Sequence, residues 1–457
     1  MTTFNPAESL HRLVKEALDS GAAASLEEAE ALFRGYSITF IIRESEVNDS
    51  ACQAALVTGV TLARRVFLGG VSVVGELNVP LNVPLPFLGA TLAEAVLLLG
   101  GRMIANAEPN SPIVTIGGGP QSKINQFHIR AVFSGWRGGI VPANTETSLQ
   151  GDMVMPLAPM MAVAFSINEA FLFVRRETGA AGHRSVGLSL WKLGDAADWL
   201  SVDSDGPSLR YLPSCLWLIG LGHLGQAYLW GLGLLPYSKP DSLHLVLQDI
   251  DIITPSTEST SVLSDINLVG QKKTRAMAGW SESRGFKTSI HERRFDGSFR
   301  RQRDEPSIAL CGLDNAIGRQ ALDSIGFDFV VETGLGRGFR DFRTIRLHTL
   351  PSTRPAATIW KNGAKEEDLS TRAAYQRMRE KNELDRCGIT LLAGKAVGAP
   401  FVGAIAACLA ISEVLRLLHC GQISQLIDMD LQDTEFLTAV PQVHDFSSLN
   451  PGFITLD

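Results

Sequence analysis

The sequence lacks the features that mark several classes of protein. Its 457 residues include only six cysteines, and no two of them form a CxxC pair. This excludes a disulfide scaffold, a tetracysteine zinc site and a thioredoxin-type motif. A net charge of −7 leaves no basic excess for a nucleic-acid backbone or an anionic membrane. We therefore expect a cytoplasmic protein that binds neither nucleic acid nor membrane and has no zinc site.

Long hydrophobic runs are also scarce. The longest uncharged apolar run, 396–411, has 16 residues and is interrupted by Pro400, whereas a spanning helix needs about 20. We expect a buried helix entered through a turn. The N-terminus shows no charged-then-apolar order, so we expect no export signal.

The first half alternates between helix-like and strand-like stretches. Residues 5–34 and 50–67 have helical spacing, and strands are predicted at 37–42, 71–74 and 113–116. This order predicts βαβ units.

The second half repeats that order. Apolar strands are predicted at 216–219, 243–247, 307–310 and 327–331, with a turn and helix over 220–235. Strands that are apolar throughout and alternate with helices predict a parallel sheet covered on both faces.

A segment of loop composition, 196–214, separates the halves. The halves also match in residue type at five positions that lie 244 residues apart, which suggests a duplication: Pro156 and Pro400, Ala162 and Ala406, Phe165 and Leu409, Ile167 and Ile411, Glu169 and Glu413. We predict two related α/β domains in tandem, at 1–195 and 213–457, joined by a linker at 196–212.

The strongest local motif is a glycine turn, Gly220-Leu-Gly222-His-Leu-Gly225, placed between a predicted strand and a predicted helix. Glycines there allow a tight turn and bring backbone N–H groups and the helix N-terminus close to a phosphate. Asp249 ends the next strand, where an acid that holds a ribose hydroxyl is expected. The motif predicts a nucleotide or dinucleotide site, and a glycine turn that only packs is the alternative.

The residues that follow Asp249 indicate whether the predicted site binds ATP or NAD. The pattern consists of Asp249, Asp251, Lys273, Asp314, Asn315 and Arg319. With it, the chain resembles the ubiquitin-activating and sulfur-carrier adenylyltransferase superfamily. The resemblance implies two tandem Rossmann-like, doubly wound domains that form a pseudo-dimer, with ATP and Mg²⁺ as cofactors.

The same resemblance implies a role for each residue. Asp249 would hold the ribose, with Asp251 beside it, and Lys273 would hold the phosphates. Asp314 would bind the magnesium and triphosphate, with Asn315 also in the nucleotide site, while Arg319 would brace the Asp314 loop. On the residues alone, Lys273 can also be a solvated helix-start lysine, and Asp314 can be part of an Asp-Asn cap.

Two positions depart from the family. Thr257 and Thr260 stand where the family usually carries Asn and Arg, both ATP contacts. The lost guanidinium must be replaced by another arginine of this chain or of a second subunit, or catalysis is weak or absent. Arg12 is a candidate for the arginine that this family supplies from a partner subunit.

A cysteine precedes the predicted buried helix. Cys387 lies in the segment 385–395, where this superfamily places its sulfur-transfer or thioester cysteine, so the resemblance implies that it is the nucleophile. Arg386 and Lys395 are cations that could favour its thiolate. A small buried residue is the alternative.

Other thiols rank below Cys387. Cys311 and Cys408 lie in apolar stretches and are expected in the core, and Cys420 near a helix end is a distant second candidate. The charged stretch 365–385 stands where family members carry crossover or cysteine-bearing insertions, but a solvated surface helix is favoured.

The first half has no glycine turn at the corresponding position. There the sequence is Arg43-Glu44-Ser45-Glu46, whose carboxylates would repel phosphate. We predict that this domain does not bind ATP. A fused inactive partner resembles the architecture of eukaryotic ubiquitin-activating enzymes.

The leading hypothesis is an activating enzyme for a ubiquitin-like protein. It would adenylate the C-terminal glycine of that protein, form a thioester on Cys387 and transfer it to a conjugating enzyme, as in a bacterial system used in antiviral defence. A homodimer is compatible with this. The alternatives are a sulfur-carrier adenylyltransferase, a nicotinamide-dependent oxidoreductase and a non-catalytic scaffold.

Overall fold

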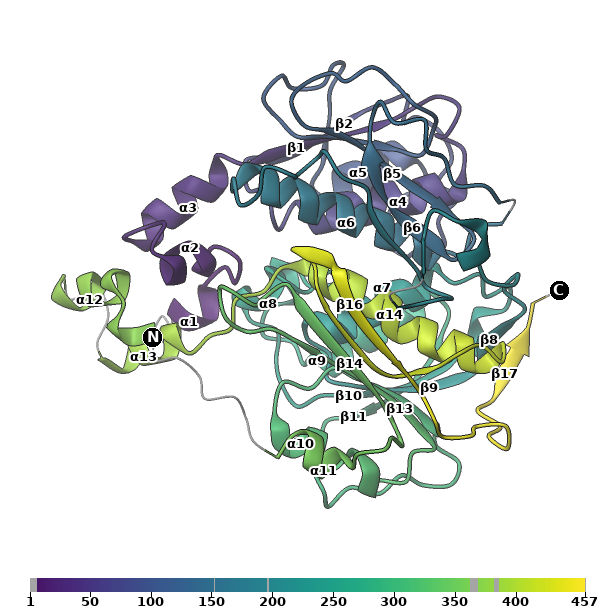
Figure 1. Cartoon of the computed structure of the whole chain (residues 1–457). Helices are drawn as coiled ribbons and strands as arrows, with labels where there is room; N and C mark the ends of the chain where they lie inside the picture. The colour runs from purple at the N-terminus through teal and green to yellow at the C-terminus, as the bar shows by residue number, and fades with distance from the viewer. Residues whose placement is uncertain (1–5, 152, 195–196, 362–368, 382–385, 457) are drawn as a thin grey trace.

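The computed structural model describes residues 6–151, 153–194, 197–361, 369–381 and 386–456. Figure 1 shows two sheet-containing parts, one built from the first half of the chain and one from the second. The fold is mixed α/β, as predicted.

The first sheet has seven strands in the order β3-β2-β1-β4-β5-β6-β7. The first five strands in this order, β3, β2, β1, β4 and β5, pair in parallel. Strands β6 and β7 then add antiparallel pairs. The bounds are β1 Ser37–Ile42, β2 Gly70–Val74, β3 Arg102–Met103, β4 Ile113–Ile116, β5 His128–Ser134, β6 Arg137–Pro142 and β7 Val186–Ser189. The helices between them are α4 Ser50–Ala63, α5 Leu92–Leu98 and α6 Leu157–Val174.

The second sheet has eight strands in the order β11-β10-β9-β12-β13-β14-β15-β16. It again begins with parallel pairs and ends with antiparallel ones. The strands are β9 Cys215–Ile219, β10 His244–Gln248, β11 Lys287–His291, β12 Ile308–Cys311, β13 Phe329–Leu335, β14 Thr344–Leu350, β15 Ser424–Asp430 and β16 Asp433–Pro441. The helices are α7 His223–Leu234, α8 Pro255–Glu258, α9 Lys273–Ser283, α10 Ala316–Gln320, α11 Ala356–Ile359, α12 Ala373–Glu380, α13 Arg386–Ala393 and α14 Pro400–Leu418.

The two strand orders follow the same pattern, as expected for the predicted duplication. The long apolar helices α6 and α14 occupy corresponding places and contact each other between the two sheets (Figure 1). Each carries a buried glutamate that accepts a backbone N–H from the chain that follows it: Gly182 N donates to Glu169 and Ser424 N donates to Glu413, both over 3.1 Å. Both helices are long and apolar enough to span a membrane, but 89% of each is buried inside the protein. They are core helices, as predicted for 396–411.

The sequence did not predict the antiparallel strands β6, β7 and β14 to β16, or the parallel strands β3, β5 and β11. A second prediction was wrong in part, because the loop-like segment 196–214 contains a strand, β8 Tyr211–Pro213. This strand pairs with β17 Phe453–Thr455 at the other end of the chain. Its partner lies so far away in sequence that no local pattern announces the pairing.

The N-terminal segment lies beside the second domain. The predicted helical stretch 5–34 forms three helices, α1 Pro6–Ser9, α2 Lys15–Ser20 and α3 Leu26–Arg34, and α1 contacts α13 (Figure 1). The stretch 365–385 was predicted to be a solvated surface helix, and for α12 this is correct on one face only. Its Tyr375 is buried and donates a hydrogen bond over 2.5 Å to Asp19 on α2. Residues 365–368 and 382–385 lie outside the described part of the chain.

Candidate active site

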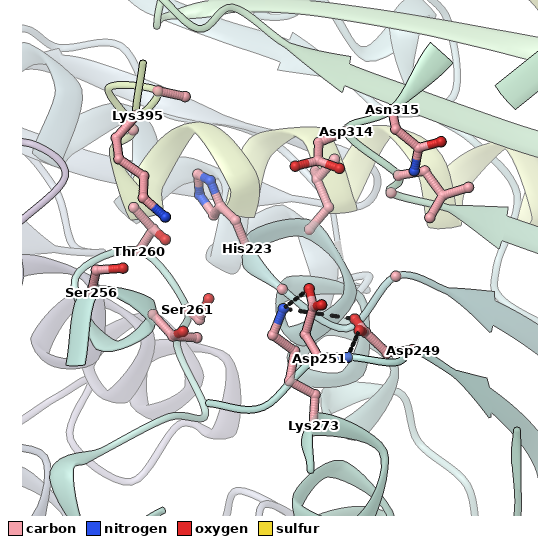
Figure 2. A pocket seen from close by; sticks show the side chains of 18 of the residues that line it. His223, Asp249, Asp251, Ser256, Thr260, Ser261, Lys273, Asp314, Asn315 and Lys395 are labelled. Carbon is pink, nitrogen blue, oxygen red and sulfur yellow. Dashed lines mark hydrogen bonds and ion pairs between the residues drawn. The ribbon is translucent and has the colours of Figure 1, made fainter. Parts of the chain in front are cut away.

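A cavity of about 900 Å³ opens at the carboxyl ends of β9, β10 and β12. Parallel sheets bind their ligands at this edge. The far wall comes from α8 and the 390–398 segment, and the N-terminal residues Glu8 and Arg12 also reach the cavity. Figure 2 shows the predicted acidic and basic side chains converging on it.

The glycine turn forms the floor of the cavity. Gly220 has a positive φ of 84°, which favours glycine. A Cβ added at Gly225 would overlap the Gly220 carbonyl oxygen, so a side chain there cannot be accommodated without moving backbone. Helix α7 begins at His223, directly after Gly222. The partial positive charge of the helix N-terminus therefore faces the cavity.

Asp249 is bound to this turn. It accepts a hydrogen bond from the Leu221 backbone N over 2.7 Å, and its side chain is only 9% exposed. Lys273, at the start of α9, lies 3.9 Å from Asp249 and 3.0 Å from Asp251, whose side chain is 63% exposed. Figure 2 shows this ion pair at one side of the cavity. Two of the predicted acids and the predicted lysine therefore form one cluster.

The second acidic position lies across the cavity. Asp314 is exposed, and its carboxylate has no hydrogen bond or ion pair within the described ranges. The side chain of Asn315 accepts the Gly318 N–H over 2.7 Å and so caps α10. Arg319 donates to the Leu313 carbonyl over 2.8 Å and pairs with the buried Glu332 over 2.9 Å. Arg319 thereby fixes the backbone directly before Asp314.

Thr257 and Thr260 line the cavity opposite the cluster of Asp249, Asp251 and Lys273. Arg12, from the same chain, lies nearby: its backbone N donates over 3.1 Å to Oγ of Ser259, which stands between the two threonines in sequence, and its guanidinium donates to the Ala396 carbonyl over 2.8 Å. Burial lowers the pKa of Arg12, the neighbouring Arg337 lowers it further, and Asp314 opposes this. A guanidinium from the N-terminal segment thus stands next to the position where the family arginine is missing.

Three further arginines line the cavity and were not predicted from the sequence: Arg293, Arg294 and Arg337. They follow β11 and β13, so their placement depends on the order of the strands. The run Arg293-Arg294 after a strand end was the available signal.

His223 lies within the glycine turn, between Gly222 and Gly225. Its ring packs against α14, since a Cβ added at Gly403 would overlap Nε2. Within the described part of the chain, Nε2 has no hydrogen-bond partner. Burial, followed by the charge of Arg12, lowers the pKa of His223 to about 4, so the ring is neutral at pH 7.

The predicted nucleophile, Cys387, is the second residue of α13, but its side chain lies outside the described residues. Cys311 and Cys408 are fully buried, as predicted. Burial raises the pKa of the Cys311 thiol to about 12 and also raises that of Cys408. Cys420 is exposed just beyond α14.

Comparison with known proteins gives matches along most of the chain. A family model described as the BilD N-terminal domain matches residues 37–190, and one described as the BilD C-terminal domain matches residues 212–421. The bacterial E1-like protein BilD of Collimonas sp. (strain OK412) is 45% identical over 451 residues, which cover 97% of each chain.

Solved structures match less closely. E. coli MccB with ATP is 14% identical, with a TM-score of 0.34 over 50% of this chain and 63% of MccB. E. coli tRNA N6-threonylcarbamoyladenosine dehydratase, TcdA, is 16% identical, with a TM-score of 0.30 over 45% of this chain and 86% of TcdA. The two domain matches and the full-length relative show the family: this chain belongs to the BilD family of bacterial E1-like proteins.

Proposed function

We propose that the chain activates the C-terminal glycine of a ubiquitin-like protein by ATP-dependent adenylation. One observation carries the proposal: the glycine turn, Asp249, Lys273 and Asp314 converge on a single cavity at the carboxyl edge of the second sheet. The volume of about 900 Å³ lies within the range of small-molecule sites. Membership of an E1-like family supports the same reaction.

In the proposed reaction, a carboxylate oxygen of the substrate attacks the α-phosphorus of ATP. The bond from that phosphorus to the bridging oxygen breaks, pyrophosphate leaves, and an acyl adenylate remains. The N-terminus of α7 and the ammonium of Lys273 would stabilise the charge that develops on the phosphates. Asp249 would hold the ribose, because it lies at the end of β10 beside the turn.

The residues fit a magnesium ion bound together with the nucleotide. Asp314 offers an exposed carboxylate without a competing partner in the described ranges. No cluster of three metal-ligating side chains occurs among the described residues. Magnesium in nucleotide sites typically takes one or two carboxylates and completes its shell with phosphate oxygens and water. When bound, the ion would neutralise phosphate charge.

The second proposed step uses Cys387. Its thiolate would attack the carbonyl carbon of the acyl adenylate, the bond from that carbon to the phosphate oxygen would break, and AMP would leave with the electron pair. The thiol proton would pass to solvent. The resulting thioester could then be passed to the cysteine of a conjugating enzyme.

Calorimetric titration tests the nucleotide site. Wild-type protein, Asp249→Ala and Lys273→Ala are titrated with Mg·ATP and, separately, with NADH. We expect ATP to bind the wild type and to bind both variants at least tenfold more weakly. Binding of NADH without ATP would contradict the proposal and favour an oxidoreductase, and binding of neither would favour a scaffold.

The thioester step has a separate test. Wild type, Cys387→Ala and Cys420→Ala are incubated with ATP and the ubiquitin-like protein, and the adduct is followed on gels with and without reductant. We expect an adduct that thiol cleaves, lost only in Cys387→Ala, while ATP-dependent pyrophosphate release persists. An adduct in Cys387→Ala would contradict the role of this cysteine. Pyrophosphate release without any adduct in the wild type would favour a sulfur-carrier adenylyltransferase.

A further inference from the structure

Several cations that line the cavity have no role in the proposed reaction, and Lys395 is one of them. Lys395 lies two residues after the end of α13, is half-buried and lines the cavity. Within the described ranges its ammonium makes neither a hydrogen bond nor an ion pair. By contrast, Lys273 in the same cavity pairs with Asp251 over 3.0 Å.

The 395–398 turn is held against the region where the family arginine is missing. A Cβ added at Gly398 would lie 3.1 Å from Thr260 Cγ2 and 3.8 Å from His223 Nδ1. Arg12 fixes the same turn through its 2.8 Å hydrogen bond to the Ala396 carbonyl. In Figure 2, the ammonium of Lys395 points towards Thr260 and His223, on the opposite side of the cavity from Asp249.

The charges around Lys395 favour a bound anion. Burial lowers its pKa, and Arg12 lowers it further, against smaller opposing effects from Glu8, Asp251 and Asp314. A partly buried ammonium without a close counter-ion is unfavourable, and an anion that binds next to it removes that cost. A doubly charged phosphate group is such an anion.

The order of groups along the cavity indicates which phosphates are involved. The ribose would lie at Asp249. Lys273 comes next, since its ammonium is 3.9 Å from a Cβ added at Gly222, at the N-terminus of α7. Lys395 and Thr260 lie beyond, at the end farthest from Asp249. We propose that Lys395 binds the β- and γ-phosphates of ATP and takes over the role of the arginine that is absent at Thr260.

This assignment rests on the proposed ATP site and differs from the role suggested by sequence alone, in which Lys395 favours the Cys387 thiolate. Cys387 and Ala393 lie six residues apart in α13, or roughly 9 Å along a helix axis. The turn that carries Lys395 begins only after this distance. Lys395 lines the nucleotide cavity, and this is the basis for assigning it to the phosphates.

The experiment compares nucleotides that differ only in their terminal phosphates. Wild type, Lys395→Met, Lys395→Arg and the control Lys239→Met are titrated calorimetrically with Mg·ATP and with AMP. Lys239 is exposed at the amino end of β10, at the opposite edge of the sheet. We expect Lys395→Met to weaken ATP binding about 10- to 100-fold, to leave AMP binding unchanged, and to be rescued by Lys395→Arg. Lys239→Met should match the wild type.

Four results would overturn the assignment. ATP binding that Lys395→Met leaves unchanged would remove Lys395 from the site. If Lys395→Met weakens the binding of ATP and AMP equally, Lys395 has a structural role and does not bind the terminal phosphates. A wild type that binds AMP and ATP equally would also contradict it, whereas a wild type that binds neither nucleotide would overturn the ATP site itself and this assignment with it.

Discussion

The turns after the two central strands, β1 and β9, differ although their sheets correspond. Ile42 pairs with Ile116 at the end of β1, and Ile219 pairs with Cys311 at the end of β9. In the first domain, Arg43 follows and donates to the Gly119 carbonyl over 2.8 Å, so its side chain occupies the space above the strand ends. In the second domain, Gly220 follows and the cavity remains open. The sheet provides the location, and the turn residues decide whether a ligand fits.

The acid at the end of the neighbouring strand is present in both domains. Counting from the β1–β2 and β9–β10 registers, Glu76 occupies the position of Asp249. Glu76 is exposed, whereas Asp249 is 9% exposed and accepts the Leu221 N–H of the glycine turn. An acid at this position becomes part of a site only when a glycine turn reaches it.

The largest expected effect comes from removing the glycine turn. Gly225→Val places side-chain atoms on the Gly220 carbonyl, and we expect it to lower the free energy of unfolding by about 3 kcal/mol or more and to abolish ATP binding. Asn48→Ala, in the exposed loop of the first domain, should change stability by less than about 0.5 kcal/mol. Urea denaturation and calorimetry check both. Normal ATP binding by Gly225→Val would contradict the role of the turn.

A pH titration compares one buried histidine in each domain. Burial is the main reason why the pKa of His128 and that of His223 fall to about 4, while the unfolded value is near 6.5. The unfolded chain therefore binds more protons, and the stability contributed by each neutral ring is complete above pH 6.5 and is lost as pH falls towards 4. At pH 5 each histidine should lower the free energy of unfolding by about 2 kcal/mol relative to pH 7.5.

Urea denaturation at pH 7.5 and pH 5 measures this loss. His128→Gln and His223→Gln should each reduce the difference between the two pH values, and the exposed His183→Gln should leave it unchanged. An unchanged difference in either buried-site variant would show that its histidine takes up no proton on unfolding.

The sequence predicted the centre of each domain better than its margins. Strands β1 and β4 lie where the apolar runs placed them, because a strand buried on both faces is apolar throughout. The edge strand β11 is mostly exposed and β16 partly so, and neither gives such a run. The convergence of Asp249, Lys273 and Asp314 on one cavity was predictable because each follows a strand end or starts a helix.

The other side of the cavity was not predictable in the same way. Arg12 and Lys395 are separated by most of the chain, and they meet only because the N-terminal segment packs on α13 and on the turn that follows it. A contact of this kind depends on tertiary packing, and no local spacing indicates it. The sequence named Arg12 as a candidate for the missing arginine, and the structure places it on the turn that carries Lys395.

The comparison of the two acids gives a smaller effect. Asp249→Asn removes the charge but keeps the shape, and we expect ATP binding to weaken about tenfold because a charged hydrogen bond is replaced by a neutral one. Glu76→Gln should bind ATP like the wild type. Calorimetry with Mg·ATP measures both. Equal weakening in the two variants would show that the first domain contributes to nucleotide binding.

The smallest effect concerns Arg43. Arg43→Ala removes the hydrogen bond to Gly119, and we expect a loss of about 1 kcal/mol in the free energy of unfolding, measured in urea. It should create no nucleotide site, because the turn still carries side chains at Glu44, Ser45 and Glu46 and two of these are acidic. The double variant Asp249→Ala, Arg43→Ala tests this in calorimetry, since any ATP binding above that of Asp249→Ala alone must come from the first domain. Such binding would mean that Arg43 alone blocks a working site in the first domain. If the first domain binds no ATP, the glycine turn itself accounts for the difference between the two domains.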